Sequence, residues 1–183
     1  ATVEVDEDRL CLIANGNRIQ FIYAPDPAGL NYGEYGIKNA ILIDNTGVWK
    51  DDAGLGQHLA SSGVEKVLLT APAKGDIPNI VYGVNDGEIA GQSIISAASC
   101  TTNAATPVLK VLDKTDGIEQ AHIDTVHAFP NDQHLIDTSH KADRRGRSAA
   151  LDMVITSPGA AKAVAKAYRP LAGKLTGNAI RVP

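Results

Sequence analysis

Apolar and polar positions follow two different patterns along this chain. Up to residue 23 they alternate in short runs, and the dipeptide Asn15-Gly16 separates two of these runs as the turn of a β-hairpin would. After Pro25 and Pro27, compact apolar runs alternate with longer segments of helical character. Strands that alternate with helices predict an α/β fold built on a doubly wound parallel sheet.

The expected elements are short and closely spaced, and no internal repeat or low-complexity linker separates them. Strands are expected at 40–43, 66–69, 79–82, 93–97, 121–126, 151–155 and 178–182. Helices are expected at 51–61, 100–114 and 159–168, and a long polar loop at 130–148.

Composition narrows the class of protein without identifying it. Hydrophobic residues make up 44% of the 183 residues, enough for a core, and the net charge of −4 argues against nucleic acid as the main partner. No apolar run approaches the ~20 residues of a membrane span, and the first residues do not resemble a signal peptide. Two cysteines do not make a disulfide framework, so we expect a reducing, cytoplasmic location.

The strongest candidate for chemistry is Cys100, in the run Ser99-Cys100-Thr101-Thr102-Asn103. The thiol follows an apolar strand and opens a helix, and the positive end of the helix dipole favours the reactive thiolate. His127, in a later apolar strand, supplies a candidate base, and a cysteine with a histidine is the minimum set for covalent attack on a carbonyl. Cys11 lies in an alternating strand with no base nearby in sequence, so we interpret it as structural.

The cysteine run 98–103 is highly specific, and further matching segments occur in a fixed order at 28–30, 45–47, 70–75, 81–85, 125–127, 159–164 and 173–183. With these segments the chain resembles the phosphorylating glyceraldehyde-3-phosphate dehydrogenase family. Nothing in the chain matches the glycine-rich NAD-binding turn with which the family opens, and the family continues beyond the last strand. We therefore expect the central part of such an enzyme, inactive as an isolated fragment. Residues 1–98 would be the second half of a Rossmann-type NAD-binding domain, and residues 99–183 the first part of an α+β catalytic domain.

The resemblance implies oxidation of glyceraldehyde 3-phosphate to 1,3-bisphosphoglycerate with NAD, in glycolysis or gluconeogenesis. By this resemblance Cys100 forms a thiohemiacetal and then a thioester, His127 is its base, and inorganic phosphate releases the acyl phosphate. The family is homotetrameric around its catalytic-domain sheet, so we expect a homotetramer of the full-length protein, with no nucleic acid or membrane partner. NADP stays open as the cofactor because the ribose-binding segment is not matched.

The resemblance also assigns binding residues. The residues matched to substrate or phosphate sites are Ser99, Thr101, Arg145, Gly159 and Arg181. The residues matched to the cofactor are Thr46, Gly47 and Thr70, at strand ends where open parallel sheets bind ligands. Asn131 is a further cofactor candidate in the loop after His127.

Two prolines depart from the family pattern. Pro130 and Pro158 stand where the family has threonine, and each removes a hydroxyl and a backbone N–H from an anion site. A lost hydrogen bond to a charged ligand costs about 1.5–3 kcal/mol. Three alternatives follow: an enzyme with an altered substrate, for example a larger sugar phosphate such as erythrose 4-phosphate, a weak enzyme, or a non-catalytic or redox-sensing family member. We expect no metal, because His134 and His140 share a loop without a third ligand.

Overall fold

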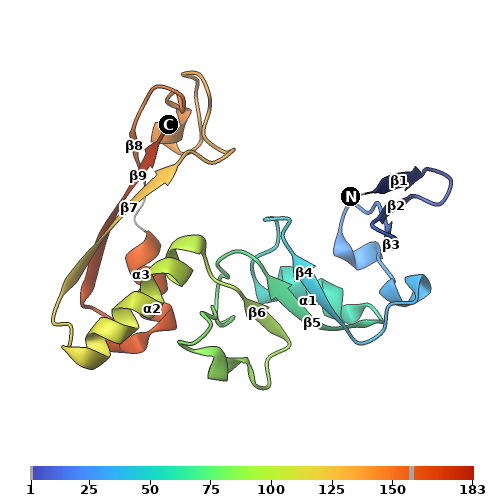
Figure 1. Cartoon of the computed structure of the whole chain (residues 1–183), viewed down its shortest axis with the longest axis horizontal. Helices are drawn as coiled ribbons and strands as arrows, with labels where there is room; N and C mark the ends of the chain where they lie inside the picture. Colours follow the sequence, from blue (N-terminus) through green and yellow to red (C-terminus); the bar gives the residue numbers. More distant parts are fainter. Residues whose placement is uncertain (1, 157–158) are drawn as a thin grey trace.

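The structure is a computed structural model that describes residues 2–156 and 159–183. Within these residues the strands form three three-stranded sheets, which follow one another along the chain (Figure 1). One sheet is antiparallel, one is parallel and one is mixed. The mixed α/β class is therefore observed.

The antiparallel sheet comprises β1 (Val3–Asp6), β2 (Cys11–Ala14) and β3 (Asn17–Gln20). Asn15 and Gly16 join β2 to β3, with φ values of 50° and 80°. Positive φ at both central residues is typical of the primed turns that fit the twist of a hairpin, so the hairpin prediction is confirmed. The 3₁₀ helices η1 (Pro27–Gly29) and η2 (Tyr32–Tyr35) follow.

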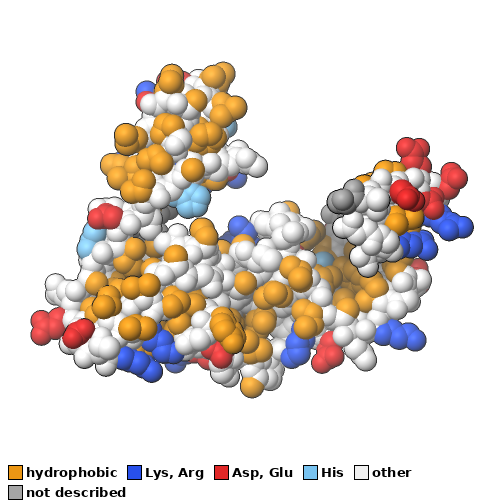
Figure 2. Space-filling model, in the orientation of Figure 1, with side chains coloured by type: hydrophobic (Ala, Val, Ile, Leu, Met, Phe, Trp, Pro, Cys, Tyr) orange, Lys and Arg blue, Asp and Glu red, His pale blue; other side chains and the backbone are white. Residues whose placement is uncertain are grey.

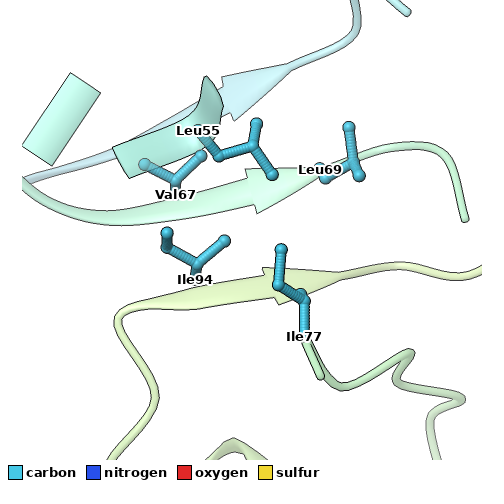
Figure 3. Packing of buried hydrophobic residues seen from close by; sticks show 5 residues of the cluster. All are labelled: Leu55, Val67, Leu69, Ile77 and Ile94. Atoms are coloured by element: carbon cyan, nitrogen blue, oxygen red, sulfur yellow. The ribbon is translucent and has the colours of Figure 1, made fainter. Parts of the chain in front are cut away.

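The parallel sheet comprises β4 (Ala40–Asp44), β5 (Val64–Leu69) and β6 (Ile94–Ser96), in that order. The helix α1 (Asp52–Ala60) connects β4 to β5, and its first turn is capped by Asp51, whose carboxylate accepts a hydrogen bond from the Gly54 N–H at 3.0 Å. The core between helix and sheet consists of five buried apolar residues (Figure 3), namely Leu55, Val67, Leu69, Ile77 and Ile94. Three parallel strands with one crossover helix give the α/β pattern. The doubly wound arrangement, with helices on both faces of the sheet, stays a prediction.

The strand expected at 79–82 does not form. Asn79 makes a single parallel bridge to Ser96, and the chain then turns away from the sheet. The Asn85 side chain accepts the hydrogen bond of the Val81 N–H at 2.8 Å, so this N–H does not join a strand ladder. The 3₁₀ helix η3 (Asp86–Ile89) follows the turn.

The mixed sheet has β9 (Leu175–Val182) at its centre, parallel to β7 (Ala121–Ala128) and antiparallel to β8 (Val154–Thr156). The helices α2 (Cys100–Thr115) and α3 (Gly159–Ala167) pack together, and α3 also packs on β9. Gly177 permits the close pairing of β9 with β7, since a Cβ there would lie 2.8 Å from the Ile123 carbonyl oxygen. The 3₁₀ helices η4 (Asp143–Gly146) and η5 (Arg169–Leu171) lie in the connections. Among the described residues, no helix is both long and apolar enough to cross a membrane.

Candidate active site

Cys100 is the first residue of α2 and follows β6 at the carboxyl edge of the parallel sheet. Ser99 caps the helix, and its hydroxyl accepts a hydrogen bond from the Thr102 N–H at 3.1 Å. The Cys100 side chain is exposed, whereas Cys11 is buried in the antiparallel sheet. The helix start therefore presents its thiol where the positive end of the helix dipole meets solvent.

His127 lies near the end of β7 and faces this thiol. Its Nε2 is 3.9 Å from the Cys100 Sγ, and its Nδ1 is 2.6 Å from the carbonyl oxygen of Ala128. A carbonyl oxygen only accepts hydrogen bonds, so Nδ1 carries the ring hydrogen and Nε2 directs its lone pair toward the sulfur. This tautomer is the one that can take a proton from the thiol.

One cavity of about 320 Å³ brings together all seven residues predicted for catalysis and anion binding. They are Ser99, Cys100, Thr101, His127, Arg145, Gly159 and Arg181. The parallel pairing of β7 with β9 places Arg181 directly opposite His127. Residues far apart in the sequence therefore meet beside the thiol.

The two arginines supply the positive charge of this cavity. Arg181 Nε is buried and has no hydrogen-bond acceptor among the described residues. Arg145 forms an ion pair with Asp132, and its guanidinium group donates to the Thr156 hydroxyl at 3.4 Å. Planar guanidinium groups bind carboxylates and phosphates in bidentate fashion, so the cavity suits an anionic ligand.

The three cofactor candidates lie outside this cavity but at the same edge of the parallel sheet. Thr46 and Gly47 follow β4 and Thr70 follows β5, and all three are exposed. The Asp44 carboxylate accepts hydrogen bonds from the Thr46 N–H and hydroxyl at 2.9 and 2.8 Å, which holds the turn. Gly47 has φ +74°, and no heavy atom lies within 4 Å of the position of an added Cβ. Exposed hydroxyls and an open backbone at the carboxyl edge of parallel strands fit a dinucleotide.

The remaining sequence candidates are Asn131, the two prolines Pro130 and Pro158, and the loop histidines His134 and His140. Asn131 and Pro130 do not line the cavity, although both lie in the loop after β7. Pro158 lies outside the described residues. The His134 and His140 rings have centroids 5.0 Å apart, and the described residues contain no group of three or more ligating side chains that could hold a metal.

Sequence reasoning missed seven of the residues that line the cavity, among them Pro72, Thr125 and Thr156. Thr125 could have been found, because it precedes His127 by two positions on one strand and so shares its face. Thr156 and Pro72 carry no such local signal. A wider hollow of about 630 Å³ also reaches Cys100, and the apolar side chains of α2 and the strand β7 line it.

Comparison with known proteins bears on this site directly. A family model for the glyceraldehyde 3-phosphate dehydrogenase C-terminal domain matches residues 99–183. A "Glyceraldehyde-3-phosphate dehydrogenase-like protein" of Pseudomonas aeruginosa (strain UCBPP-PA14) is 60% identical over the whole chain, which covers 40% of that relative. The chloroplastic glyceraldehyde-3-phosphate dehydrogenase A of Zea mays is 48% identical over 92% of this chain and 41% of its own length. The glyceraldehyde-3-phosphate dehydrogenase of Borreliella burgdorferi is 44% identical over 94% of this chain and 52% of its own length. The chain thus spans two fifths to about half of these relatives.

Proposed function

Because this chain belongs to the glyceraldehyde-3-phosphate dehydrogenase family, we propose that the protein oxidises glyceraldehyde 3-phosphate to 1,3-bisphosphoglycerate. The observation that carries the proposal is the meeting of a cysteine–histidine pair with two arginines in one cavity. Membership of this family supports an oxidoreductase activity. All the relatives reported above have names that refer to glyceraldehyde-3-phosphate dehydrogenase, so neither a larger sugar phosphate nor a non-catalytic role is favoured.

The first step is covalent addition of Cys100 to the aldehyde. His127 Nε2 takes the thiol proton, and the Sγ lone pair forms a C–S bond with the aldehyde carbon. The carbonyl π electrons move to oxygen, and the imidazolium returns the proton to that oxygen to give a thiohemiacetal. The 3.9 Å between Sγ and Nε2 is long for a hydrogen bond, as expected of catalytic pairs before substrate binds.

The phosphates are held by the other residues of the cavity. Arg181 has a buried Nε without an acceptor in residues 2–156 and 159–183, so we assign it to the substrate phosphate. Ser99, Thr101 and the N-terminal end of α3 at Gly159 offer two hydroxyls and a backbone N–H for the attacking inorganic phosphate. Arg145 would neutralise charge between the two sites.

The cofactor would bind along the carboxyl edge of the parallel sheet. Thr46, Gly47 and Thr70 would hold it, within a cofactor domain that we assign to residues 1–98, and residues 99–183 would belong to the catalytic domain. NAD, when bound, would accept the hydride from the thiohemiacetal carbon, while His127 Nε2 takes the hydroxyl proton and a thioester remains; NADP is the alternative with the same chemistry.

The last step releases Cys100. An oxygen of inorganic phosphate attacks the thioester carbon, the C–S bond breaks, and the sulfur leaves as a thiolate while the acyl phosphate departs. The positive end of the α2 dipole stabilises that thiolate, which makes it a better leaving group.

The test is reduction of NAD by the full-length protein with glyceraldehyde 3-phosphate and inorganic phosphate. Cys100→Ser should lower kcat by about three orders of magnitude or more, because the nucleophile acts as a unit with its base. Cys11→Ser is the matched control, since Cys11 is buried in another sheet and should leave kcat unchanged. Retention of turnover by Cys100→Ser would reject the proposal.

We also propose a homotetramer of the full-length protein that forms through the sheet β7–β9–β8. Hydrophobic side chains cover much of the lobe that these strands form (Figure 2), and Val126 and Ile155 are 69% and 58% exposed. Exposed apolar patches of this kind mark protein contacts. Light scattering of the full-length protein would test this. A cytoplasmic location is a further proposal from the cysteine content, and it needs its own test because the Zea mays relative is chloroplastic.

A further inference from the structure

The chain makes an unusual turn two residues before the candidate nucleophile. Ala98 has φ +60°, in the left-handed region, and its side chain is buried. A residue with a Cβ is strained there and stays only when its surroundings enforce the conformation. Ala98 links the end of β6 to the Ser99 cap of α2, so its dihedral angles set the direction in which α2 and the Cys100 thiol emerge.

One support of this turn lies inside the protein. The Ser96 hydroxyl is completely buried and accepts a hydrogen bond from the Ala98 N–H at 3.0 Å. The hydroxyl oxygen also lies 2.7 Å from the carbonyl oxygen of Ala71 and 3.0 Å from Asn79 Oδ1, so it has acceptors for its own hydrogen. Because Ala71 and Asn79 lie on separate segments next to β6, Ser96 fastens the turn to its surroundings.

The second support lies on the outside. The Asn103 side chain donates from Nδ2 to the carbonyl oxygens of Ala97 and Ser99, at 2.8 and 2.9 Å. One amide group therefore bridges the carbonyls of the residues on either side of Ala98. Asn103 is exposed and stands in the first turn of α2, where its own N–H already bonds to the Ser99 carbonyl oxygen.

We propose that Ser96 and Asn103 are positioning residues that hold Ala98 in its left-handed conformation and so keep the Cys100 thiol within reach of His127. The two partners of the pair come from separate parts of the chain. The register of β7 with β9 fixes His127, and the turn at Ala98 fixes Cys100. Without the two supports, Ala98 would relax toward negative φ and redirect the start of α2. The inference rests on the proposed role of Cys100 as the nucleophile.

The experiment measures iodoacetamide labelling at pH 7 in the full-length protein, with peptide mass spectrometry reporting Cys100 and Cys11 separately. Ser96→Ala and Asn103→Ala should each lower the labelling rate of Cys100 by about tenfold, because small misplacements of a reacting group have effects of this size. Cys11 should stay slow in both variants. A purely structural role would instead leave the Cys100 rate unchanged, because this thiol is already exposed, and would speed the labelling of buried Cys11 as the fold loosens.

Two further variants separate positioning from stability. Ser61→Ala is the matched control, because the Ser61 hydroxyl accepts a hydrogen bond from the Tyr32 N–H at the same 3.0 Å but lies far from α2 in sequence. It should leave the Cys100 rate unchanged. Ala98→Gly should also keep fast labelling, since glycine adopts positive φ without strain. Asn103 is exposed, so its alanine variant should fold even if Ser96→Ala does not.

The outcomes distinguish the two proposals. If unaltered Cys100 labels no faster than Cys11, the proposed nucleophile and this inference both fail. If unaltered Cys100 labels fast and folded Asn103→Ala labels equally fast, the positioning role alone is rejected. Slow labelling of Cys100 in the two alanine variants, with normal rates in Ser61→Ala and Ala98→Gly, is the result we expect.

Discussion

Arg181 offers the sharpest test of how this site recognises its substrate. The guanidinium lines the Cys100 cavity, and its buried Nε has no acceptor among the described residues. Replacing Arg181 with Gln removes the charge and the bidentate donor while keeping a polar side chain. Loss of a hydrogen bond to a charged group costs about 1.5–3 kcal/mol, which corresponds to roughly tenfold to 150-fold in kcat/KM.

The assay compares two aldehydes in the full-length protein. For glyceraldehyde 3-phosphate, Arg181→Gln should lower kcat/KM by that factor. For unphosphorylated glyceraldehyde, kcat/KM should change by less than about threefold, because no phosphate is there to lose its partner. Arg147→Gln is the control: this arginine lies 3.4 Å from an Asp137 oxygen and 3.6 Å from an Asp152 oxygen, and it does not line the cavity.

Equal losses for the two aldehydes would refute the reasoning, since they would mean that Arg181 acts on the thiol or the fold rather than on the phosphate. The midpoint temperature of thermal unfolding, measured without ligand, provides a second test. Arg181 is partly buried and its Nε lacks an acceptor among the described residues, so Arg181→Gln should leave this midpoint unchanged or raise it. A large fall would also count against the assignment.

Three further predictions concern other parts of the molecule. Burial, and secondly the Asp44 carboxylate, raises the pKa of Tyr32, whose hydroxyl lies 2.7 Å from His58 Nδ1. The folded state therefore holds this proton more tightly: the resulting stability is complete below the unfolded pKa of about 10 and is lost as the pH rises through the higher folded pKa. Tyr32→Phe should remove this alkaline loss in urea unfolding measured from pH 8 to 11, and an unchanged pH profile would contradict the assignment. Leu55→Ala, in the core under α1, should lower the free energy of unfolding by about 2–5 kcal/mol, and a loss below 1 kcal/mol would contradict the packing. Pro130→Thr should change the KM for inorganic phosphate by less than about threefold, because Pro130 does not line the cavity, and a tenfold fall would place this position in the phosphate site after all.

Local sequence was sufficient wherever a feature depends on neighbouring residues. The Asn15-Gly16 turn, the start of a helix at Cys100 and the interpretation of Cys11 as structural follow from dihedral preferences, capping and periodicity. Local sequence was misleading at 79–82, where we expected a strand that does not form. Its apolar run looked like a strand, but the Asn85 side chain takes the Val81 N–H.

Among the arginines of the loop 130–148, the structure supports the choice of Arg145, which the sequence made only by resemblance. Arg145 lines the cavity next to Thr156, whereas Arg147 approaches surface carboxylates. Which way an arginine points in an irregular loop depends on remote partners, such as the His134 N–H, which donates to the carbonyl oxygen of Arg145. No periodicity in the loop encodes those partners.

The sequence by itself determined which residues can do the chemistry: a thiol at a helix start, a histidine in a strand and arginines for anions. Only the tertiary structure decided that these residues meet. The 3.9 Å between Cys100 and His127 depends on the left-handed turn at Ala98, which buried and surface hydrogen bonds enforce, and on the pairing of β7 with a strand about fifty residues later. The physical reason is that propensities act between near neighbours along the chain, whereas strained turns and strand registers persist only when distant segments pack against them.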